Sequence, residues 1–326
     1  MTLDFERAAE VLSEAPEVAI ACHVNPDADA LGSMLGLSAF LRALGGRTIC
    51  SYPNEPLEPP RWAALLPGAD GLVPAKEFPR QPEVMVTCDC AALDRLAQLA
   101  PVADRAGELI WIDHHRSNDG LGTIPLVDPA ASSTCEMVFR LIAIMGGQMP
   151  DETAICLYAG LVTDTGKFQY EATTPDTLRM AATLREHDFD HARLVQALYE
   201  DNPTSYLCLV GVALARLDHV AEADLVWTYL TQFDLQEAGV RPTETDDLID
   251  VIRTARDVDV AAIVKQQRDG RFKVSVRSRG KHDLAAVAAT FGGGGHRLAA
   301  GYTSAHGPAE TIDRLTRALR GEPVTP

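Results

Sequence analysis

Four apolar segments in the first half of the chain each lead directly into an aspartate or a histidine. The segments are residues 18–22, 84–88, 108–112 and 157–163, and the residues that follow them are His23, Asp89, Asp113 and Asp164. The first three segments have the length of buried strands in a parallel sheet. Because an open α/β sheet binds its ligands at the carboxyl ends of its strands, we expect these polar residues to meet in one site.

The first half of the chain alternates strands and helices. Apolar runs predict strands at 18–22, 47–51, 84–88 and 108–112, and helical periodicity predicts helices at 29–44, 91–100, 132–146 and 151–162. Asp151, directly after Pro150, can begin the last of these helices. Strands and helices that alternate at this length predict an α/β fold with a mostly parallel, doubly wound sheet.

The second half of the chain has a different pattern. Three helical stretches follow one another between residues 175 and 218, and after them come a strand at 224–230, a helix at 243–256 and a hairpin of 259–266 with 271–278. We therefore predict an N-terminal domain at 1–190, a helical connector at 191–218 and a smaller mixed α/β domain with a glycine-rich loop at 219–326.

Composition limits the functions that this chain can have. The net charge of −17 argues against a protein that wraps long DNA through many phosphate contacts. A short phosphorylated substrate remains compatible with this charge if metal ions and local basic residues hold its phosphates. The seven cysteines lack CxxC spacing and lie mostly in apolar runs, as reduced core thiols do. With no apolar stretch of about 18 residues and no secretion signal, we expect a cytoplasmic protein without membrane contact.

The segment 23–33, HVNPDADALGS, holds the densest group of polar residues. Pro26 disfavours helix at the residue before it, so the chain leaves the strand in an extended turn that presents His23 and Asp27 to one point. Asp29 lies at the start of the next helix, where a carboxylate favours both the helix dipole and a metal. For this segment alone, a purely structural interpretation, in which Asp27 or Asp29 only caps the helix, stays open.

Asp89 lies between two cysteines, Cys88 and Cys90, which raises the alternative of a zinc thiolate site. A single CxC pair is poor zinc spacing, and strand alternation points both thiols away from the carboxylate between them. We therefore interpret Asp89 as an oxygen ligand and both cysteines as packing residues. A cap on the following helix is its structural alternative.

Asp113 is followed by two histidines, His114 and His115. Because neighbouring side chains at a strand end diverge, we expect one histidine to bind metal and the other to face the substrate. Asp164 adds a carboxylate in the segment 163–166, TDTG, where Gly166 allows a tight turn. A turn stabilised by the Asp164 side chain is the alternative for that segment.

These segments, in this order, resemble the successive motifs of the DHH phosphoesterase superfamily. They are residues 23–33, the strand end at Asp89, the triplet 113–115 and the segment 163–166. The segment 291–301, FGGGGHRLAAG, is similar to the glycine-rich motif of the substrate-binding domain associated with that superfamily. In size and arrangement the chain is most similar to the bifunctional oligoribonucleases, or nano-RNases, that also act as 3′-phosphoadenosine 5′-phosphate phosphatases.

The resemblance implies a centre of two Mn²⁺ ions, for which Mg²⁺ or Co²⁺ can substitute. One ion would take His23, Asp27 and Asp89, and the other would share Asp89 and take Asp29, His114 and Asp164. The resemblance also assigns two catalytic roles: His115 contacts the scissile phosphate or protonates the leaving group, and Asp113 orients the site.

The C-terminal part is expected to select the substrate. Between residues 265 and 297, eight basic residues stand against two acidic ones. Glycines 292–295 can turn backbone N–H groups toward an anion, and His296 or Arg277 can add charged hydrogen bonds. A solvated hairpin beside a flexible turn is the structural alternative. The candidate substrate-binding residues are Arg116, Arg277, Ser278, Gly293, Gly294, Gly295 and His296.

The resemblance predicts a metal-dependent hydrolase. Its expected substrates are short single-stranded RNA or DNA oligonucleotides, including linear dinucleotides, which it would cut to mononucleotides. A second expected activity is that of a 3′(2′),5′-bisphosphate nucleotidase on small phosphorylated nucleotides. Two alternatives stay open: a phosphodiesterase acting on cyclic dinucleotides, and a non-catalytic nucleotide-binding regulator built on the same fold. The sequence also leaves open whether the protein is a homodimer.

Overall fold

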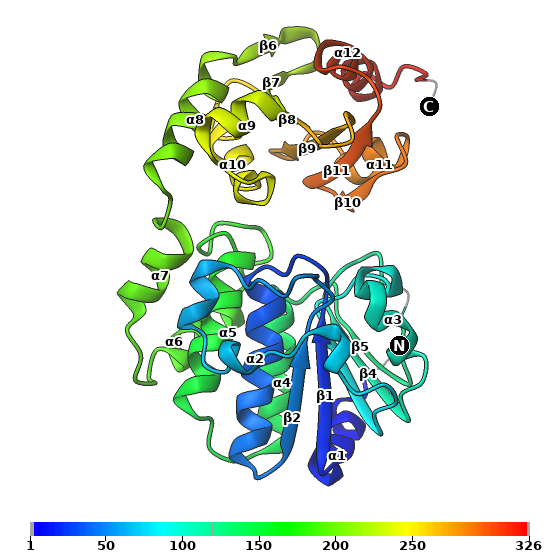
Figure 1. Cartoon of the computed structure of the whole chain (residues 1–326), viewed down its shortest axis with the longest axis vertical. Coiled ribbons are helices and arrows are strands. Elements are labelled where there is room, and N and C mark those ends of the chain that lie inside the picture. Colours follow the sequence, from blue (N-terminus) through cyan, green and yellow to red (C-terminus); the bar gives the residue numbers. More distant parts are fainter. Residues whose placement is uncertain (1–2, 119, 325–326) are drawn as a thin grey trace. The chain divides into compact units, whose positions relative to one another are not determined.

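The structure is a computed structural model that describes residues 3–118 and 120–324 (Figure 1). The chain divides into two compact units, Met1–Asp201 and Asn202–Pro326. The helical connector predicted at 191–218 contains α7 (His191–Tyr199), which lies in the first unit, and α8 (Thr204–Ala215), which lies in the second. No helix within the described part of the chain has the length and hydrophobicity needed to cross a membrane.

The first unit is built on a five-stranded sheet in which every neighbouring pair is parallel (Figure 1). The order is β2-β1-β3-β4-β5, with β1 at Glu17–Cys22, β2 at Arg47–Ser51, β3 at Val84–Cys88, β4 at Glu108–Asp113 and β5 at Ile124–Val127. The α/β fold and the parallel sheet predicted from the sequence are confirmed. Strand β5 was not predicted, because a run of four residues that contains Pro125 carries little strand signal.

Side chains are buried on both faces of this sheet. One face packs against α1 (Phe5–Glu14), α2 (Ala28–Ala43), α4 (Thr134–Met145) and α5 (Asp151–Asp164). The other packs against a smaller set of segments that includes η4 (Leu93–Leu99) and α3 (Ala100–Ala103). The remaining elements are α6 (Pro175–Leu184) and three short 3-10 helices between β2 and β3: η1 (Arg61–Leu65), η2 (Ala69–Gly71) and η3 (Ala75–Glu77). Burial on both faces explains why β1, β3 and β4 read as continuous apolar runs.

The prediction of one α-helix at 91–100 is wrong. The segment forms the 3-10 turns of η4 and then the four-residue helix α3. Ala97 has a φ of 41°, which an α-helix does not tolerate. The carbonyl of Arg95 accepts a hydrogen bond from the N–H of Val24 at 3.0 Å rather than from within a helix. A tertiary contact has therefore overridden the local helical pattern.

The second unit contains a six-stranded mixed sheet in the order β10-β11-β9-β8-β7-β6. The strands are β6 (Asp218–Val220), β7 (Leu225–Leu230), β8 (Val260–Gln266), β9 (Phe272–Ser278), β10 (Gly294–His296) and β11 (Ala299–Ser304). Strands β7 and β8 are parallel, and the other pairs are antiparallel. The predicted mixed α/β domain and its hairpin of β8 with β9 are confirmed.

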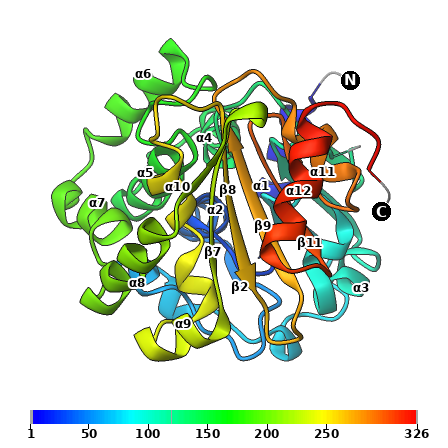
Figure 2. The ribbon, with the colours of Figure 1, turned by 90° about the horizontal axis from the view of Figure 1, so that it is seen from above.

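Helices lie on both sides of this second sheet (Figure 2). The helices α11 (Leu284–Ala289) and α12 (Pro308–Leu319) pack on one side, and α8, α9 (Gln232–Ala238) and α10 (Leu248–Ile252) pack on the other. The helix predicted at 243–256 is shorter than expected, because the 3-10 helix η6 (Pro242–Thr245) precedes α10. The carbonyl of Thr245 accepts from the buried amino group of Lys265 at 3.3 Å instead of continuing a helix.

Candidate metal centre and substrate-binding residues

The predicted ligands gather at the carboxyl end of the first sheet. His23, Asp89 and His114 follow β1, β3 and β4, whereas Asp27 and Asp29 lie at the start of α2, and Asp164 ends α5. Three groups of these side chains have ligand atoms within 4.8 Å of one another: His23 with Asp27 and Asp89, Asp29 with His114 and Asp164, and Asp89 with His114 and His115. The structure therefore brings all six predicted ligands together.

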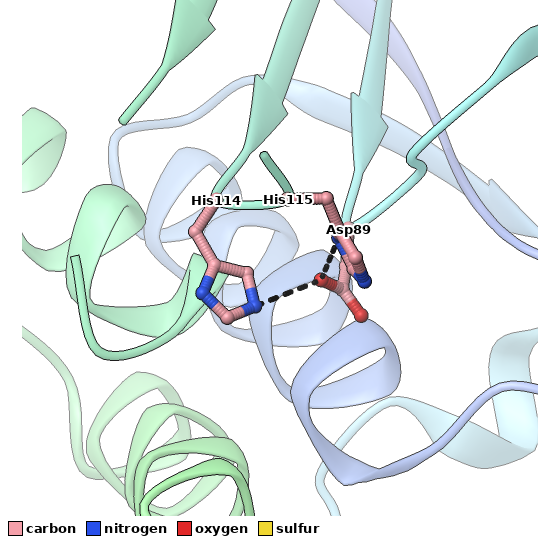
Figure 3. A group of neighbouring side chains, drawn as sticks. All are labelled: Asp89, His114 and His115. Carbon is pink, nitrogen blue, oxygen red and sulfur yellow. Dashed lines mark ion pairs between the residues drawn. The ribbon is translucent and has the colours of Figure 1, made fainter. Parts of the chain in front are cut away.

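Asp89 lies at the centre of this cluster and is only 2% exposed. Its Oδ2 lies 3.4 Å from Nε2 of His23, and its Oδ1 lies 3.8 Å from Nε2 of His114 and 3.7 Å from Nδ1 of His115. Figure 3 shows the rings of His114 and His115 on two sides of this carboxylate. The two oxygens of Asp89 thus face two different groups of side chains, as a shared ligand requires.

Backbone carbonyls hold two of the imidazole rings in place. Nδ1 of His23 lies 2.9 Å from the carbonyl oxygen of Val24, and Nδ1 of His114 lies 3.3 Å from that of Ala131. A carbonyl only accepts, which favours a proton on Nδ1 of His114, whereas Nδ1 of His23 also lies 3.1 Å from a guanidinium nitrogen of Arg95. Nε2 of both rings faces the carboxylates, as in a histidine that binds a metal through this nitrogen.

Asp27 and Asp29 are both held by helix N-termini. Oδ1 of Asp27 accepts from the N–H groups of Asp29 and Ala30 at 3.1 and 3.0 Å, so the capping interpretation is correct for that oxygen. Asp29 is 1% exposed, and its two oxygens accept from the N–H groups of Thr134 and Cys135 at 2.7 and 2.9 Å. The N-terminus of α4 therefore stabilises a buried carboxylate that belongs to the cluster.

His115 forms a chain of hydrogen bonds with two residues behind it. Nδ1 of His115 lies 2.7 Å from Oδ1 of Asp113, which is fully buried. The amide of Asn118 donates to the other oxygen of Asp113 at 2.7 Å and to the carbonyl of Cys90 at 3.2 Å. Burial opposes a charged His115, but the hydrogen bond to Asp113 and the charge of Asp89 raise the pKa of His115 to about 9. The hydrogen bond to Asp113 therefore orients the imidazole and favours its protonated form.

Burial and mutual repulsion both disfavour the charged form of the carboxylates in the cluster. Burial, together with the charge of Asp89, raises the pKa of Asp29 to about 7. Burial and the charges of Asp29 and Asp89 also raise the pKa of Asp164 well above its ordinary value. A divalent cation among these carboxylates would oppose both shifts, because a nearby positive charge favours the ionised form.

The donor set fits a hard divalent cation. Carboxylate oxygens and imidazole nitrogens make up the cluster, and these are the ligands that Mn²⁺ and Mg²⁺ prefer. The zinc thiolate alternative fails, because Cys88 is packed in the core against α2 and Cys90 is packed in the core on the opposite face of the sheet. The strand alternation expected across residues 88–90, which would put both thiols on one face, is wrong, because β3 ends at Cys88 and Asp89 has a positive φ of 57°. Burial raises the pKa of the Cys90 thiol to about 12 and that of Cys88 well above its usual range, which disfavours the thiolate form that binds zinc.

A left-handed turn follows Asp164. Gly166, Lys167 and Phe168 all have positive φ angles, of 56°, 62° and 65°. The hydroxyl of Thr165 accepts from the N–H of Phe168 at 3.1 Å, and the Lys167 ammonium lies 4.0 Å from the ring centre of Tyr199. The tight turn expected at Gly166 is confirmed: a Cβ there would lie 2.3 Å from the Tyr170 ring.

Three side chains that contact the site residues were not predicted from the sequence: Thr134, Asn118 and Arg95, whose guanidinium lies 3.1 Å from Nδ1 of His23. The hydroxyl of Thr134 donates to Oδ1 of Asp89 at 2.9 Å, and Asn118 supports Asp113 as described above. The pattern Ser-x-x-Glu at 133–136 marks the start of a helix and could have indicated that Thr134 lies in its first turn. No comparable local pattern marks Asn118.

In the second unit, Arg277 and Ser278 end β9 beside a buried carboxylate. Ser278 donates its hydroxyl proton to Oδ2 of Asp259 at 2.8 Å and accepts from the N–H of Gly280 at 2.9 Å. Asp259 also accepts from the N–H groups of Arg279 and Lys281. Ser278 and Asp259 therefore shape the loop that follows β9. Arg277 is half-buried, and its guanidinium donates to the carbonyl of Val276 at 3.1 Å.

Part of the glycine-rich segment forms a strand that pairs with β11, whereas the sequence predicted a turn whose N–H groups face an anion. Gly294, Gly295 and His296 form the edge strand β10 against β11, and all three are exposed. The N–H of Gly293 donates to the carbonyl of Ala288 at 2.9 Å, so this group is not available to an anion. A Cβ at Gly293 would lie 2.2 Å from the carbonyl oxygen of Gly301, which explains the need for glycine there. In the first unit, Arg116 lies in an exposed turn after His115.

The basic patch expected from residues 265–297 is partly neutralised. Asp246 pairs with both Lys265 and Lys273, at 2.5 and 3.1 Å. Asp224 pairs with Lys281, and Asp269 pairs with Arg271 at 2.8 Å. Asp246 and Asp224 lie outside residues 265–297, so the charges within that stretch alone overstate the positive charge of this surface.

Comparison with known proteins agrees with this geometry. Residues 17–161 match the family model described as DHH family, N-terminal domain, and residues 224–322 match the DHHA1 domain. The bifunctional oligoribonuclease and PAP phosphatase of Thermus thermophilus is 35% identical over 317 residues, which are 96% of this chain and 93% of that protein.

Two solved structures share the fold. An exopolyphosphatase-related protein from Bacteroides fragilis superposes with a TM-score of 0.90 at 26% identity, covering 97% of this chain and 95% of its own. The exonuclease RecJ from Thermus thermophilus, in complex with Mn²⁺, superposes with a TM-score of 0.59 at 17% identity and covers 100% of this chain and 56% of its own. The second likeness is one of fold alone.

Proposed function

The chain belongs to the DHH family of phosphoesterases, and on this premise we propose that it hydrolyses short oligonucleotides to mononucleotides with two Mn²⁺ ions. The second activity that we propose is removal of the 3′-phosphate from 3′-phosphoadenosine 5′-phosphate. The observation that carries the proposal is the convergence of six ligand side chains around one buried carboxylate, Asp89. The free cysteines and the chemistry of the substrates favour the cytoplasm as its location.

The proposed ligands divide into two sets that share Asp89. His23, Asp27 and Oδ2 of Asp89 would hold one ion, and Asp29, His114, Asp164 and Oδ1 of Asp89 would hold the other. Two divalent ions, when bound, activate a water for attack on phosphorus and stabilise the charge that develops on the phosphate oxygens. Mg²⁺ and Co²⁺ are the expected substitutes in solution.

His115 is the proposed proton donor. Hydrolysis joins a water oxygen to phosphorus and breaks the bond to the leaving nucleoside oxygen, which must then gain a proton. Asp113 holds Nδ1 of His115 at 2.7 Å, so Nε2 is the nitrogen that remains to face a leaving group. Asn118 fixes Asp113 in turn. We therefore assign His115 to proton transfer and Asp113 to its orientation.

The second unit is the proposed source of substrate selection. Arg277, Gly294, Gly295 and His296 are the residues of this unit that we expect to contact a terminal phosphate. Arg116, in the first unit, is a separate candidate for contact with the substrate. Ser278 has its proton committed to Asp259, which favours a role in loop shape over phosphate binding. The functional division is thus chemistry in residues 1–190 and selection in 219–326, joined by the helices of 191–218.

A panel of substrates tests the proposal directly. With Mn²⁺, RNA and DNA of two to about five nucleotides should be hydrolysed faster than a 24-nucleotide strand, and 3′-phosphoadenosine 5′-phosphate should release inorganic phosphate. A chelator should stop both reactions, because the carboxylates alone cannot activate water. Cyclic di-AMP in the same panel tests the cyclic dinucleotide alternative. If no nucleotide is hydrolysed with Mn²⁺ present, the non-catalytic regulator is the better interpretation.

Arg277 provides a separate test of substrate selection. Replacement by alanine should raise KM for dinucleotides by about 10- to 100-fold, since a charged hydrogen bond to phosphate contributes about 1.5–3 kcal/mol. Turnover at saturation and Mn²⁺ stoichiometry should change little. Arg320→Ala, which removes an exposed arginine paired with Glu322, is the matched control. Unchanged KM in Arg277→Ala would remove this residue from the proposed phosphate site.

A further inference from the structure

We propose that Thr134 is a positioning residue that sets the rotation of the Asp89 carboxylate and thereby the affinity of one of the two metal positions. The inference rests on the proposed metal centre and adds a residue that is itself no ligand. Thr134 is the first residue of α4 and is fully buried.

Thr134 contacts two of the clustered carboxylates at once. Its hydroxyl donates to Oδ1 of Asp89 at 2.9 Å, and its backbone N–H donates to Oδ2 of Asp29 at 2.7 Å. One residue therefore fixes the spacing between Asp29 and Asp89. The hydroxyl does so without adding a positive charge that would compete with a cation, as a lysine at this place would.

The rotation of Asp89 decides which oxygen serves which metal position. The bond between Cβ and Cγ of an aspartate has a broad, nearly two-fold rotational preference, so the carboxylate needs an external partner to hold one angle. In the observed rotation, Oδ2 faces His23 at 3.4 Å and Oδ1 faces His114 at 3.8 Å. Thr134 bonds to Oδ1, the oxygen on the side of Asp29, His114 and Asp164. Loss of its hydroxyl should therefore weaken that position more than the one at His23 and Asp27.

The start of α4 is itself held rigidly, which allows Thr134 to act as a fixed donor. Ser133 caps the helix by accepting from the N–H of Glu136 at 3.0 Å. The buried carboxylate of Glu136 accepts from the N–H and the hydroxyl of Ser132, at 3.1 and 2.5 Å, and from the hydroxyl of Thr177 at 3.3 Å. The hydrogen bonds to the Glu136 carboxylate hold the backbone at the start of α4, so the Thr134 hydroxyl donates to Asp89 from a fixed position.

Calorimetric titration of the metal-free full-length protein with Mn²⁺ tests the inference without measuring activity. The wild-type protein should bind two ions. Thr134→Val replaces the hydroxyl with a methyl group and should weaken one of the two binding events by about 10- to 100-fold, the usual effect of losing a residue that orients a metal ligand. Thr134→Ser keeps a hydroxyl and should restore the affinity to within a few fold of wild type.

A double variant identifies which of the two metal positions depends on Thr134. Asp164→Asn removes a proposed ligand of the position on the Oδ1 side, so this variant should keep one Mn²⁺ site. Adding Thr134→Val to Asp164→Asn should then leave the remaining affinity nearly unchanged. A loss of about 10-fold at the remaining site, the size expected for a disturbed ligand, would contradict the assignment of Thr134 to the Oδ1 side.

Thr153→Val is the matched control for loss of a buried threonine hydroxyl. Thr153 is also fully buried, and its hydroxyl donates to the carbonyl of Gly36 at 3.0 Å, in the first turn of α5 rather than at the Asp164 end. The Thr153→Val variant should bind both Mn²⁺ ions as the wild-type protein does. If Thr134→Val does not fold, as judged by its melting temperature, Thr134→Ala removes the same hydroxyl without placing a methyl against Asp89 and carries the same expectation.

The outcomes separate this inference from the proposed function. Wild-type binding of both ions by a folded Thr134→Val or Thr134→Ala overturns the role of Thr134 and leaves the metal centre standing. Failure of the wild-type protein to bind two ions overturns the proposed centre and the inference with it. Weakened binding in Thr134→Ser as large as in Thr134→Val would also contradict the role of the hydroxyl.

Discussion

Asp89→Asn should lower kcat/KM for dinucleotide hydrolysis by at least about a thousandfold, because the loss of about 4 kcal/mol of transition-state stabilisation corresponds to that factor. The asparagine keeps the volume of the side chain, and its amide oxygen can still accept from Thr134. It loses the negative charge and the second ligand oxygen that the two metal positions share. Bound Mn²⁺ per chain, measured by calorimetry or by elemental analysis after gel filtration, should fall below two.

Asp70→Asn is the control for this variant, since Asp70 is an exposed aspartate of the same unit. Its turnover and metal content should match those of the wild-type protein. Wild-type turnover in Asp89→Asn would show that Asp89 is not the shared ligand, and the division of the cluster into two metal positions would then fail.

The tandem histidines should separate metal binding from proton transfer. His115→Ala should bind two Mn²⁺ ions but lose about 10²- to 10⁴-fold in kcat, the contribution of a general acid. His114→Ala should lose both turnover and one bound ion, because Nε2 of His114 faces Asp29, Asp89 and Asp164 at 3.3 to 3.9 Å. Single-turnover rates at saturating substrate, with Mn²⁺ titrations of the same samples, measure both effects.

Substrates with different leaving groups sharpen this test. A leaving group of low pKa needs no proton, so an activated nitrophenyl ester of a nucleotide should be hydrolysed by His115→Ala at a rate much closer to wild type. His114→Ala should stay defective with both substrates. An equal loss of Mn²⁺ in the two histidine variants would contradict the separate roles assigned to the neighbouring rings.

Much of the first unit could be predicted because its signals are local. The strands at 18–22, 84–88 and 108–112 are buried on both faces, and continuous apolar runs of that length have few other interpretations. Strand β5 and the edge strands β6 and β10 are three or four residues long, and so short a segment carries no periodicity. Residues 91–100 carried a helical pattern that the contact of Arg95 with Val24 overrides.

The site divides in the same way. His23, Asp89 and His114 could be predicted because each follows a strand, and the carboxyl ends of neighbouring parallel strands lie at one edge of the sheet. The resemblance to a known family then ordered these residues into two proposed ligand sets. The roles of Thr134 and Asn118 could not be predicted, since a threonine or an asparagine outside such a motif has many equally common uses.

The α/β fold, the parallel first sheet and the place where the proposed ligands gather could all be predicted, because these depend on apolar runs and on the residues next to them. Tertiary packing determines which carboxylate lies at the centre of the cluster, which nitrogen of each imidazole faces it and which lysines are neutralised. Those features depend on pairs far apart in the chain: Thr134 reaches Asp89 across 45 positions, and Lys265 reaches Asp246 across 19. Such contacts form only when packed elements bring their side chains together, so no local pattern records them.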